Sequence, residues 1–210
     1  MDVILSANNL KFKDIISYPT IEIERNKATF ICGQSGCGKS TLLKLFNVTE
    51  SQAQGEITYN SRDIDSIDSV ELRKEIMLVS QTVFLFDGTI EENFNQYYMY
   101  RDLPVLSTDD KSKYLSICSA DFDLSTKCET MSGGERQRVF IAICLSFKPK
   151  VLMLDEPTSA LDGATANRFF TSIKDFCFKN GITLIVISHD KSLVDLFADR
   201  IIKLERSVAD

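Results

Sequence analysis

GQSGCGKS, residues 33–40 (Gly33, Gln34, Ser35, Gly36, Cys37, Gly38, Lys39 and Ser40), follows the pattern G-x-x-x-x-G-K-[ST]. The mostly apolar residues just before it, Ala28 to Cys32, predict a buried strand. The leucine-rich residues just after it, Ser40 to Asn47, predict a helix. A phosphate-binding turn needs this immediate succession of strand, glycine-rich turn and helix.

The residue types in this turn suit a triphosphate. Glycines allow backbone N–H groups to face phosphate oxygens, and the N-terminus of the next helix adds the positive end of its dipole. We expect Lys39 to reach the β- and γ-phosphates, Ser40 to offer its hydroxyl to Mg²⁺, and Thr41 to lie among the phosphate contacts. A tight turn that binds nothing would explain the glycines but not a lysine followed by a serine.

A pair of carboxylates follows a second buried strand. The apolar run from Val151 to Leu154 ends abruptly in Asp155 and Glu156. Adjacent carboxylates at the end of a central strand repel each other unless a cation or a polarised water lies beside them. We expect Asp155 to hold Mg²⁺ through water, and Glu156 to accept a proton from the water that attacks the γ-phosphate. Alternatively, the two residues only open a loop before Pro157.

The composition excludes several classes of protein. The 210 residues carry 24 Lys and Arg against 30 Asp and Glu, a net charge of −6, and 44% of them are apolar. This is a globular chain without a basic footprint for nucleic acid. No apolar run approaches the ~20 residues that span a bilayer, and the N-terminus does not resemble a signal peptide, so we expect a cytosolic location. The cysteines lack paired spacing and are expected to be reduced: Cys32, Cys37, Cys118, Cys128, Cys144 and Cys177.

The order of predicted elements indicates an α/β fold. Strand-like runs that alternate with helical stretches predict a parallel sheet covered on both faces. Between residues 81 and 148, short helical segments replace the strands, which indicates an inserted helical subdomain. We therefore predict a single domain over residues 1–210, with its core formed by residues 1–80 and 149–210. The later predicted strands are Val151–Leu154, Thr183–Ile187 and Arg200–Leu204, and the helices between them are Asn167–Phe178 and Lys191–Phe197.

A second anion-binding helix start is predicted at Ser132-Gly133-Gly134. An apolar helical stretch follows these residues, so Ser132 is expected to cap the helix while the glycines expose its first N–H groups. On its own this signal is weak, because capped helices are common. Its weight comes from the motifs that accompany it.

Together with Gln81, Ser159-Ala160-Leu161-Asp162 and His189, these motifs resemble, in order and approximate spacing, those of the ATP-binding cassette (ABC) ATPases. The resemblance covers essentially the whole chain, and the serine-glycine-glycine element separates this family from other P-loop proteins. It implies a P-loop NTPase (RecA-like) fold: a mostly parallel sheet core, an N-terminal antiparallel β subdomain and the inserted helical subdomain. A weaker similarity to ATP-binding subunits of iron or metal exporters shares only family-wide residues.

The resemblance also implies roles for individual residues. Two such cassettes face each other head to tail, so that each ATP lies between the phosphate-binding turn of one copy and the Ser132 segment of the other. Ser132 and Gly134, with Gly133 between them, would then contact the γ-phosphate bound to the partner, and Asp162 would lie near the partner's turn. Finally, the family pattern makes Gln81 a contact of Mg²⁺ and the attacking water, and His189 a contact of the γ-phosphate.

Two features depart from the family pattern. Met131 and Glu135 stand where the family usually has leucine and glutamine, and Glu135 would bring a carboxylate close to the partner's triphosphate, so we expect altered turnover. The aromatic residue that stacks on adenine is also hard to place. Phe12 and Tyr18 are both candidates, and either could instead belong to the core.

The chain shows no membrane span, so the resemblance implies a separate transmembrane subunit. Its docking surface is expected around Thr82 to Gly88, where Phe84, Leu85 and Phe86 form an apolar cluster, with packing between the two subdomains as the alternative. We expect a peripheral Mg-ATPase subunit on the cytoplasmic side of the membrane that drives transport as a pair of cassettes, identical or not. Regulation through a membrane partner is the alternative function. A cassette that acts on nucleic acid would typically add a long coiled coil or a second cassette.

Overall fold

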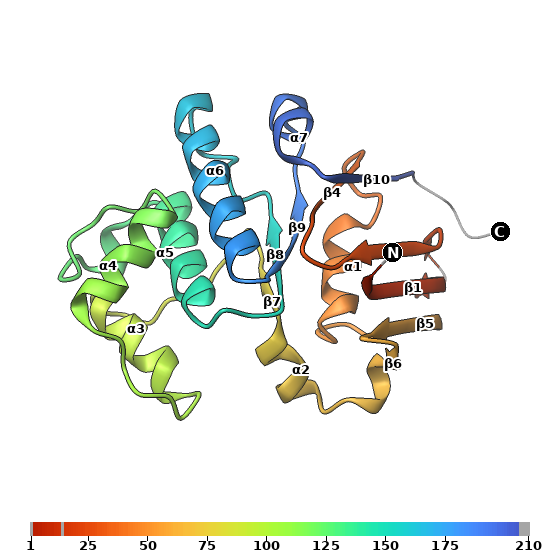
Figure 1. Ribbon diagram of the computed structural model, residues 1–210, viewed down its shortest axis with the longest axis horizontal. Coiled ribbons are helices and arrows are strands. Elements are labelled where there is room, and N and C mark those ends of the chain that lie inside the picture. Colours follow the sequence, from red (N-terminus) through yellow and green to blue (C-terminus); the bar gives the residue numbers. More distant parts are fainter. Residues whose placement is uncertain (1, 14, 206–210) are drawn as a thin grey trace.

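A five-stranded parallel sheet forms the centre of the molecule (Figure 1). The structure is a computed structural model that describes residues 2–13 and 15–205. Every pairing in this sheet is parallel, and the strand order is β10-β4-β9-β8-β7. The strands are β4 (Ala28–Gly33), β7 (Ile76–Val79), β8 (Val151–Asp155), β9 (Thr183–Ile187) and β10 (Arg200–Leu204).

A second five-stranded sheet, antiparallel and formed by the N-terminal part of the chain, lies to the right in Figure 1. Its long strand β1 pairs with β2, β3 and β5, and β5 also pairs with β6. The two sheets confirm the prediction of a parallel core with an N-terminal antiparallel β subdomain. These strands are β1 (Val3–Phe12), β2 (Ile16–Ser17), β3 (Ile21–Glu24), β5 (Gln54–Tyr59) and β6 (Arg62–Asp63).

Helices lie on both sides of the parallel sheet, and α3, α4 and α5 form a group at the left of Figure 1. Residues 81–148 contribute these three helices and no strand to either sheet. Within the described part of the chain, no helix combines the length and the apolar character needed to cross a membrane. The helices are α1 (Lys39–Phe46), α2 (Ser69–Glu75), α3 (Ile90–Met99), α4 (Thr108–Ile117), α5 (Gly133–Ser146), α6 (Gly163–Lys179) and α7 (Lys191–Phe197), with short 3₁₀ turns at Ile64–Ser66 and Cys128–Thr130.

The central strands are apolar throughout because both faces of the parallel sheet are buried. Leu152 and Leu154 pack into a core shared with α5 and α6, whereas Met153 between them packs into a core shared with α1 and the antiparallel sheet. Phe30 and Ile31 of β4 divide between the same two cores. Side chains that alternate along a strand thus hold a layer on each face of the sheet.

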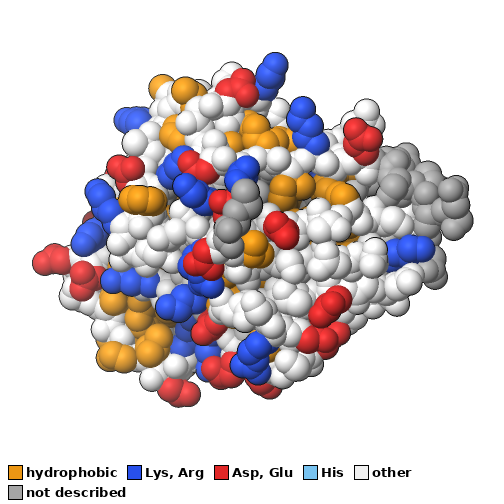
Figure 2. Space-filling model, turned by 45° about the vertical axis from the view of Figure 1, so that its right-hand side comes forward, with side chains coloured by type: hydrophobic (Ala, Val, Ile, Leu, Met, Phe, Trp, Pro, Cys, Tyr) orange, Lys and Arg blue, Asp and Glu red, His pale blue; other side chains and the backbone are white. Residues whose placement is uncertain are grey.

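The six cysteines are free thiols, as expected from their spacing. Five of them are buried and Cys32 is half-buried. Burial raises the pKa of Cys144 and of Cys177 to about 12, so these thiols act as small core side chains. Charged side chains of both signs are interspersed over the face shown in Figure 2.

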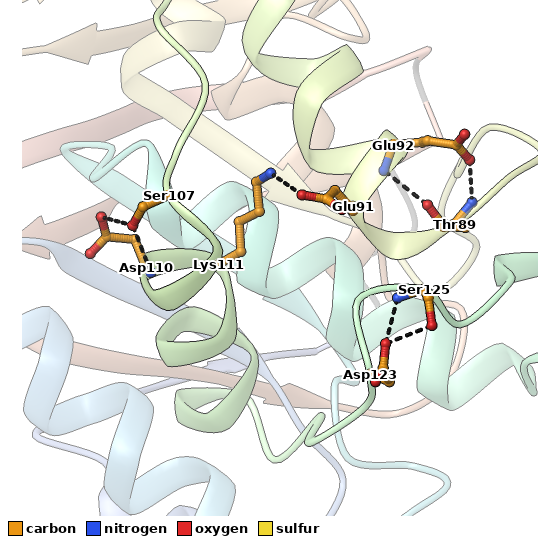
Figure 3. A network of polar contacts seen from close by, with 8 residues as sticks. All are labelled: Thr89, Glu91, Glu92, Ser107, Asp110, Lys111, Asp123 and Ser125. Atoms are coloured by element: carbon orange, nitrogen blue, oxygen red, sulfur yellow. Dashed lines mark hydrogen bonds and ion pairs between the residues drawn. The ribbon is translucent and has the colours of Figure 1, made fainter.

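Helices α3 and α4 are joined by an ion pair with one buried member (Figure 3). Lys111 Nζ lies 3.1 Å from Glu91 Oε1, and the lysine side chain is only 4% exposed, against 46% for the glutamate. Each helix start is also capped locally. Thr89 and Glu92 form a reciprocal capping box at α3, and Ser107 Oγ accepts from Asp110 N at α4. The ammonium of Lys111 therefore depends on Glu91 for its charge partner.

Removing the charge of Glu91 is expected to lower the free energy of unfolding more than removing the charge of Lys111. Glu91→Gln leaves a buried ammonium without a counter-charge and should lower the free energy of unfolding by about 1–3 kcal/mol. Lys111→Met keeps an apolar stem and leaves only a half-exposed carboxylate, so its effect should stay below about 1 kcal/mol. Urea unfolding of the two variants measures the difference, and equal losses would contradict the asymmetry.

Candidate functional site

The carboxyl ends of β4, β9 and β8 bring the predicted phosphate, magnesium and γ-phosphate residues to one edge of the parallel sheet. In the central strand, Ile187 is paired with Ile31 on one side and with Asp155 on the other. The turn at 33–40 therefore begins at the same edge of the sheet as Asp155, Glu156 and His189. In open α/β sheets this edge is where ligands bind.

Two glycines in the turn are required by their surroundings. At Gly33, a Cβ would overlap the carbonyl oxygen of Leu204 and come within 2.8 Å of the Cys37 sulfur. At Gly38, which caps α1, the backbone is left-handed with φ of 96°, and a Cβ would lie 2.8 Å from Tyr18 Oη. Only glycine fits both the dihedral angle and the space here. The loop is thereby held close to its supporting strands.

Lys39 is the first residue of α1, and its side chain reaches back to the loop. Its side chain is buried, and Nζ donates to the carbonyls of Gly33 at 3.0 Å and Gln34 at 2.9 Å. An ammonium has three N–H donors, so one remains for an acceptor such as a phosphate oxygen. The loop carbonyls thus fix the position of the charge before any anion arrives.

Tyr18 contacts the loop at Gly38. It is 6% exposed, and its hydroxyl donates to the Gly38 carbonyl at 3.0 Å. Burial raises its pKa far above the ordinary value, so the phenol stays neutral. A ring buried in this way offers no free face for stacking. Of the two aromatic candidates for adenine, Phe12 is the one that is partly exposed, with Lys13 Nζ 4.8 Å from the centre of its ring.

The residues around Asp155 fit a divalent cation. Asp155 is buried, and its Oδ1 has no hydrogen-bond partner among the described residues. Desolvation raises the pKa of this carboxyl, while a hydrogen bond from the Ser40 hydroxyl opposes the rise. An orphaned carboxylate oxygen beside a serine hydroxyl is a suitable oxygen donor set for Mg²⁺. The positions predicted for the metal, Ser40 and Asp155, are thus brought together.

Glu156 and His189 form the polar pair next to this carboxylate. Glu156 Oε1 lies 3.0 Å from His189 Nε2, and Glu156 N donates to the Ile187 carbonyl. Glu156 has a left-handed backbone, with φ of 50°, a conformation that costs a residue with a side chain about 1–2 kcal/mol. With Thr158, Ser159 and Asp190, these two residues line a depression of about 280 Å³. The strained backbone turns the Glu156 side chain toward His189.

The second group of predicted residues lies at two other helix starts. Ser132 caps α5, and its N–H and hydroxyl both donate to Glu135 Oε2 at 2.8 Å. Asp162 caps α6, where its carboxylate accepts from Ala164 N, Thr165 N and Thr165 Oγ1. Among the described residues, these caps make no hydrogen bond to the turn at 33–40. The structure therefore leaves Ser132, Gly133 and Asp162 exposed and Gly134 half-buried, outside the group around Lys39.

The same two helix starts touch each other. A Cβ on Gly134 would lie 2.9 Å from Ala160 Cβ, so the second glycine allows α5 to approach the turn that leads into α6. Hydrogen bonds from Ser132 lower the pKa of Glu135, as those from Thr165 and Ala164 do for Asp162. Both carboxylates are thus charged caps at neutral pH. The Ser132 hydroxyl donates its hydrogen bond to the Glu135 carboxylate.

Gln81 follows β7 on an exposed loop. Gln137, which the sequence analysis did not single out, joins the start of this loop to Asp155. Gln137 Nε2 donates to the carbonyls of Ser80 and Asp155, both at 3.2 Å. Tyr18 was predicted only as a base contact or core residue, and its hydrogen bond to Gly38 was also missed. For Gln137 the available signal was a polar residue on the apolar face of a predicted helix.

Known proteins resemble this chain in sequence. The model of the ABC transporter family matches residues 17–159, more than half of the chain. The ABC transporter I family member 17 of Arabidopsis thaliana is 32% identical over 186 residues, which cover 88% of this chain and 70% of that protein. The methionine import ATP-binding protein MetN 1 of Listeria monocytogenes is 28% identical over 94% of this chain but only 60% of its own length.

Solved structures share the fold. CbiO1 from Clostridium perfringens, part of the ABC transporter complex cbiONQ, superimposes with a TM-score of 0.82 at 27% identity, over 98% of this chain and 86% of that one. A bacterial Atm1-family ABC exporter with ATP bound superimposes with a TM-score of 0.86 at 25% identity, but this chain spans 38% of it. The first of these structures is part of an ABC transporter complex. The second is a longer exporter chain, of which this chain matches one part.

Gly38→Ala tests the packing of the turn. The added Cβ meets Tyr18 Oη and retains a left-handed φ, so the free energy of unfolding should fall by about 1–3 kcal/mol and binding of a fluorescent ATP analogue should weaken. Gly36→Ala is the matched control, because Gly36 also has a positive φ, of 79°, but open space around it. If both variants lost the same stability, the contact with Tyr18 would contribute nothing.

Proposed function

This chain belongs to the ABC transporter family, and we propose that it hydrolyses Mg-ATP between two cassettes to drive a separate membrane subunit. The observation that carries the proposal is the grouping of Lys39, Asp155, Glu156 and His189 at the carboxyl edge of one parallel sheet. The chain spans 70% of the plant relative and 60% of the Listeria relative, so the activity of a whole transporter is proposed rather than carried over.

The residues of the site divide the work between binding and hydrolysis. Lys39 and the backbone N–H groups of residues 33–41 bind the triphosphate, and Ser40 and Asp155 hold Mg²⁺. When bound, Mg²⁺ would neutralise charge on the β- and γ-phosphates. Glu156 accepts a proton from the attacking water, and His189, 3.0 Å away, orients that carboxylate and reaches the γ-phosphate. Gln81 positions the attacking water at the edge of the site.

The exposed caps of α5 and α6 supply the other half of the site. Ser132 and Gly134 would contact the γ-phosphate held by a second cassette, and Asp162 would lie near that cassette's turn. The exposure of Ser132 and Asp162, outside the group around Lys39, supports this assignment. ATP then stabilises the closed pair of cassettes, and hydrolysis removes that stabilisation.

An aromatic cluster beside the Gln81 loop is suited to the membrane subunit. Phe84 is 64% exposed, and its ring packs edge-on against Phe86, with centroids 4.8 Å apart. Tyr97 and Tyr100 of the α3 region contact Phe86, and the Tyr97 hydroxyl donates to the Phe84 carbonyl. Leu85 was expected on this surface, but at 3% exposure it belongs to the core. The docking surface is therefore formed by aromatic rings rather than by the whole apolar run.

Glu156→Gln tests the proposed chemistry. The amide cannot accept a proton, so the ATPase rate should fall by about 10²-fold or more, while ATP binding remains and a dimer accumulates with ATP. Steady-state hydrolysis and size-exclusion chromatography with and without Mg-ATP measure the two effects. A hydrolysis rate that stays at the wild-type level would remove Glu156 from its role, and a monomer at saturating ATP would remove the shared site.

Glu135→Gln tests the exposed cap. Glu135 and a partner's phosphate would compete as anions for the Ser132 hydroxyl, whereas glutamine keeps an acceptor without the charge. In the Glu156→Gln background, half-maximal dimerisation should need about five-fold less ATP, and high salt should reduce this difference. Asp109→Asn, which removes an exposed charge from α4, is the control. An equal effect of both variants would point to net charge alone.

A further inference from the structure

Two residues in the first turns of α5 form hydrogen bonds at both ends of the loop that contains Gln81, residues 81–84. Gln137 Nε2 donates to the carbonyl of Ser80, the residue just before Gln81. Its neighbour Arg136 donates through Nη2 to the carbonyl of Leu85, at 3.3 Å, just after the loop. Adjacent residues of one helix thus bracket residues 81–84. Displacement of this loop would strain both hydrogen bonds unless α5 moved with it.

The inner of these two contacts also reaches the magnesium residues. The second N–H of the Gln137 amide donates to the carbonyl of Asp155, at 3.2 Å, so one side chain joins the end of β7, the end of β8 and α5. Gln137 is 5% exposed, and a buried amide whose two N–H groups are both used has little freedom to adapt. The backbone of Asp155 and the start of the Gln81 loop are therefore held by the same amide group.

The outer contact links this arrangement to the start of α5. Arg136 Nη1 donates to the Cys128 carbonyl at 2.7 Å, and Cys128 N donates to the Gly88 carbonyl at 2.8 Å. The segment that follows the aromatic cluster is thus tied to the segment that leads into Ser132. Hydrogen bonds thus connect the segment of the aromatic cluster to the start of α5.

From these contacts we propose that Gln137 is a positioning residue that keeps Gln81 and Asp155 in register with α5, with Arg136 securing the outer end of the loop. The proposal rests on the proposed function, because Gln81 and Asp155 matter as residues of a magnesium site. Gln137 itself touches neither ATP nor the metal. It acts through the two backbone carbonyls that it holds.

Gln137→Met tests this role, because methionine has a similar length but no N–H donor. In the nucleotide-free protein, backbone hydrogen exchange of the Glu156 amide should rise by about five- to tenfold, because this N–H shares its peptide group with the Asp155 carbonyl and donates to the Ile187 carbonyl. The Mg²⁺ concentration for half-maximal ATPase should rise by a similar factor, while KM for ATP at saturating Mg²⁺ changes by less than about two-fold.

Ser146→Ala is the matched control. Ser146 is buried at the far end of the same helix, where its hydroxyl donates to the Ile143 carbonyl and lies 3.0 Å from the Tyr98 hydroxyl. Its loss should lower stability without changing exchange of the Glu156 amide or Mg²⁺ dependence. In a Gln81→Ala background the effect of Gln137→Met on Mg²⁺ dependence should largely disappear, because both substitutions disturb one arrangement. Additive effects would overturn the proposal.

Two further measurements keep the outcomes separate. If Gln137→Met does not fold, Arg136→Met should raise exchange of the Phe86 amide, which shares its peptide group with the Leu85 carbonyl and donates to Asn93 Oδ1, and should leave Mg²⁺ dependence unchanged. Unchanged exchange at Phe86 would overturn the bracketing of the loop. If the wild-type chain hydrolyses no ATP, the proposed function fails by itself. The exchange experiment then still decides whether Gln137 holds the Asp155 carbonyl, since it needs no activity.

Discussion

The parallel register of β4, β9 and β8 is the constraint on which the site depends. Because Ile187 is paired with both Ile31 and Asp155, three segments that are distant in sequence end at the same level. Each strand is buried on both faces, so its register is held by side chains in two separate cores. A slip of one residue in β8 would exchange the side chains of both cores and carry Asp155 away from Ser40.

Sequence alone predicted the parts of the site that directly follow apolar runs. The turn after Cys32 and the carboxylates after Leu154 were predicted because the ends of buried strands are visible as abrupt changes in polarity. His189, which only the family resemblance indicated, lies at the same edge of the sheet. The β subdomain was predicted in outline. The two-residue strands β2 and β6 are too short to have a periodicity of their own.

The sequence could not predict contacts between residues that are far apart in the chain and meet only in the folded protein. Tyr18 and Gly38 are 20 residues apart, and Gln137 and Ser80 are 57 apart, so neither pair has a local pattern. Leu85 was misplaced for a related reason. Its neighbours have the same apolar character, and only the packing of α3 and α5 decides which of the three side chains enters the core.

The burial of Leu85 between Phe84 and Phe86 also bears on how such a chain can diverge. Leu85 anchors the segment in the core, whereas the side chain of Phe84 is exposed. Substitutions at exposed positions such as Phe84 have little effect on folding. A duplicated gene could therefore acquire a new membrane partner through a few substitutions in this segment, while its nucleotide chemistry is inherited intact.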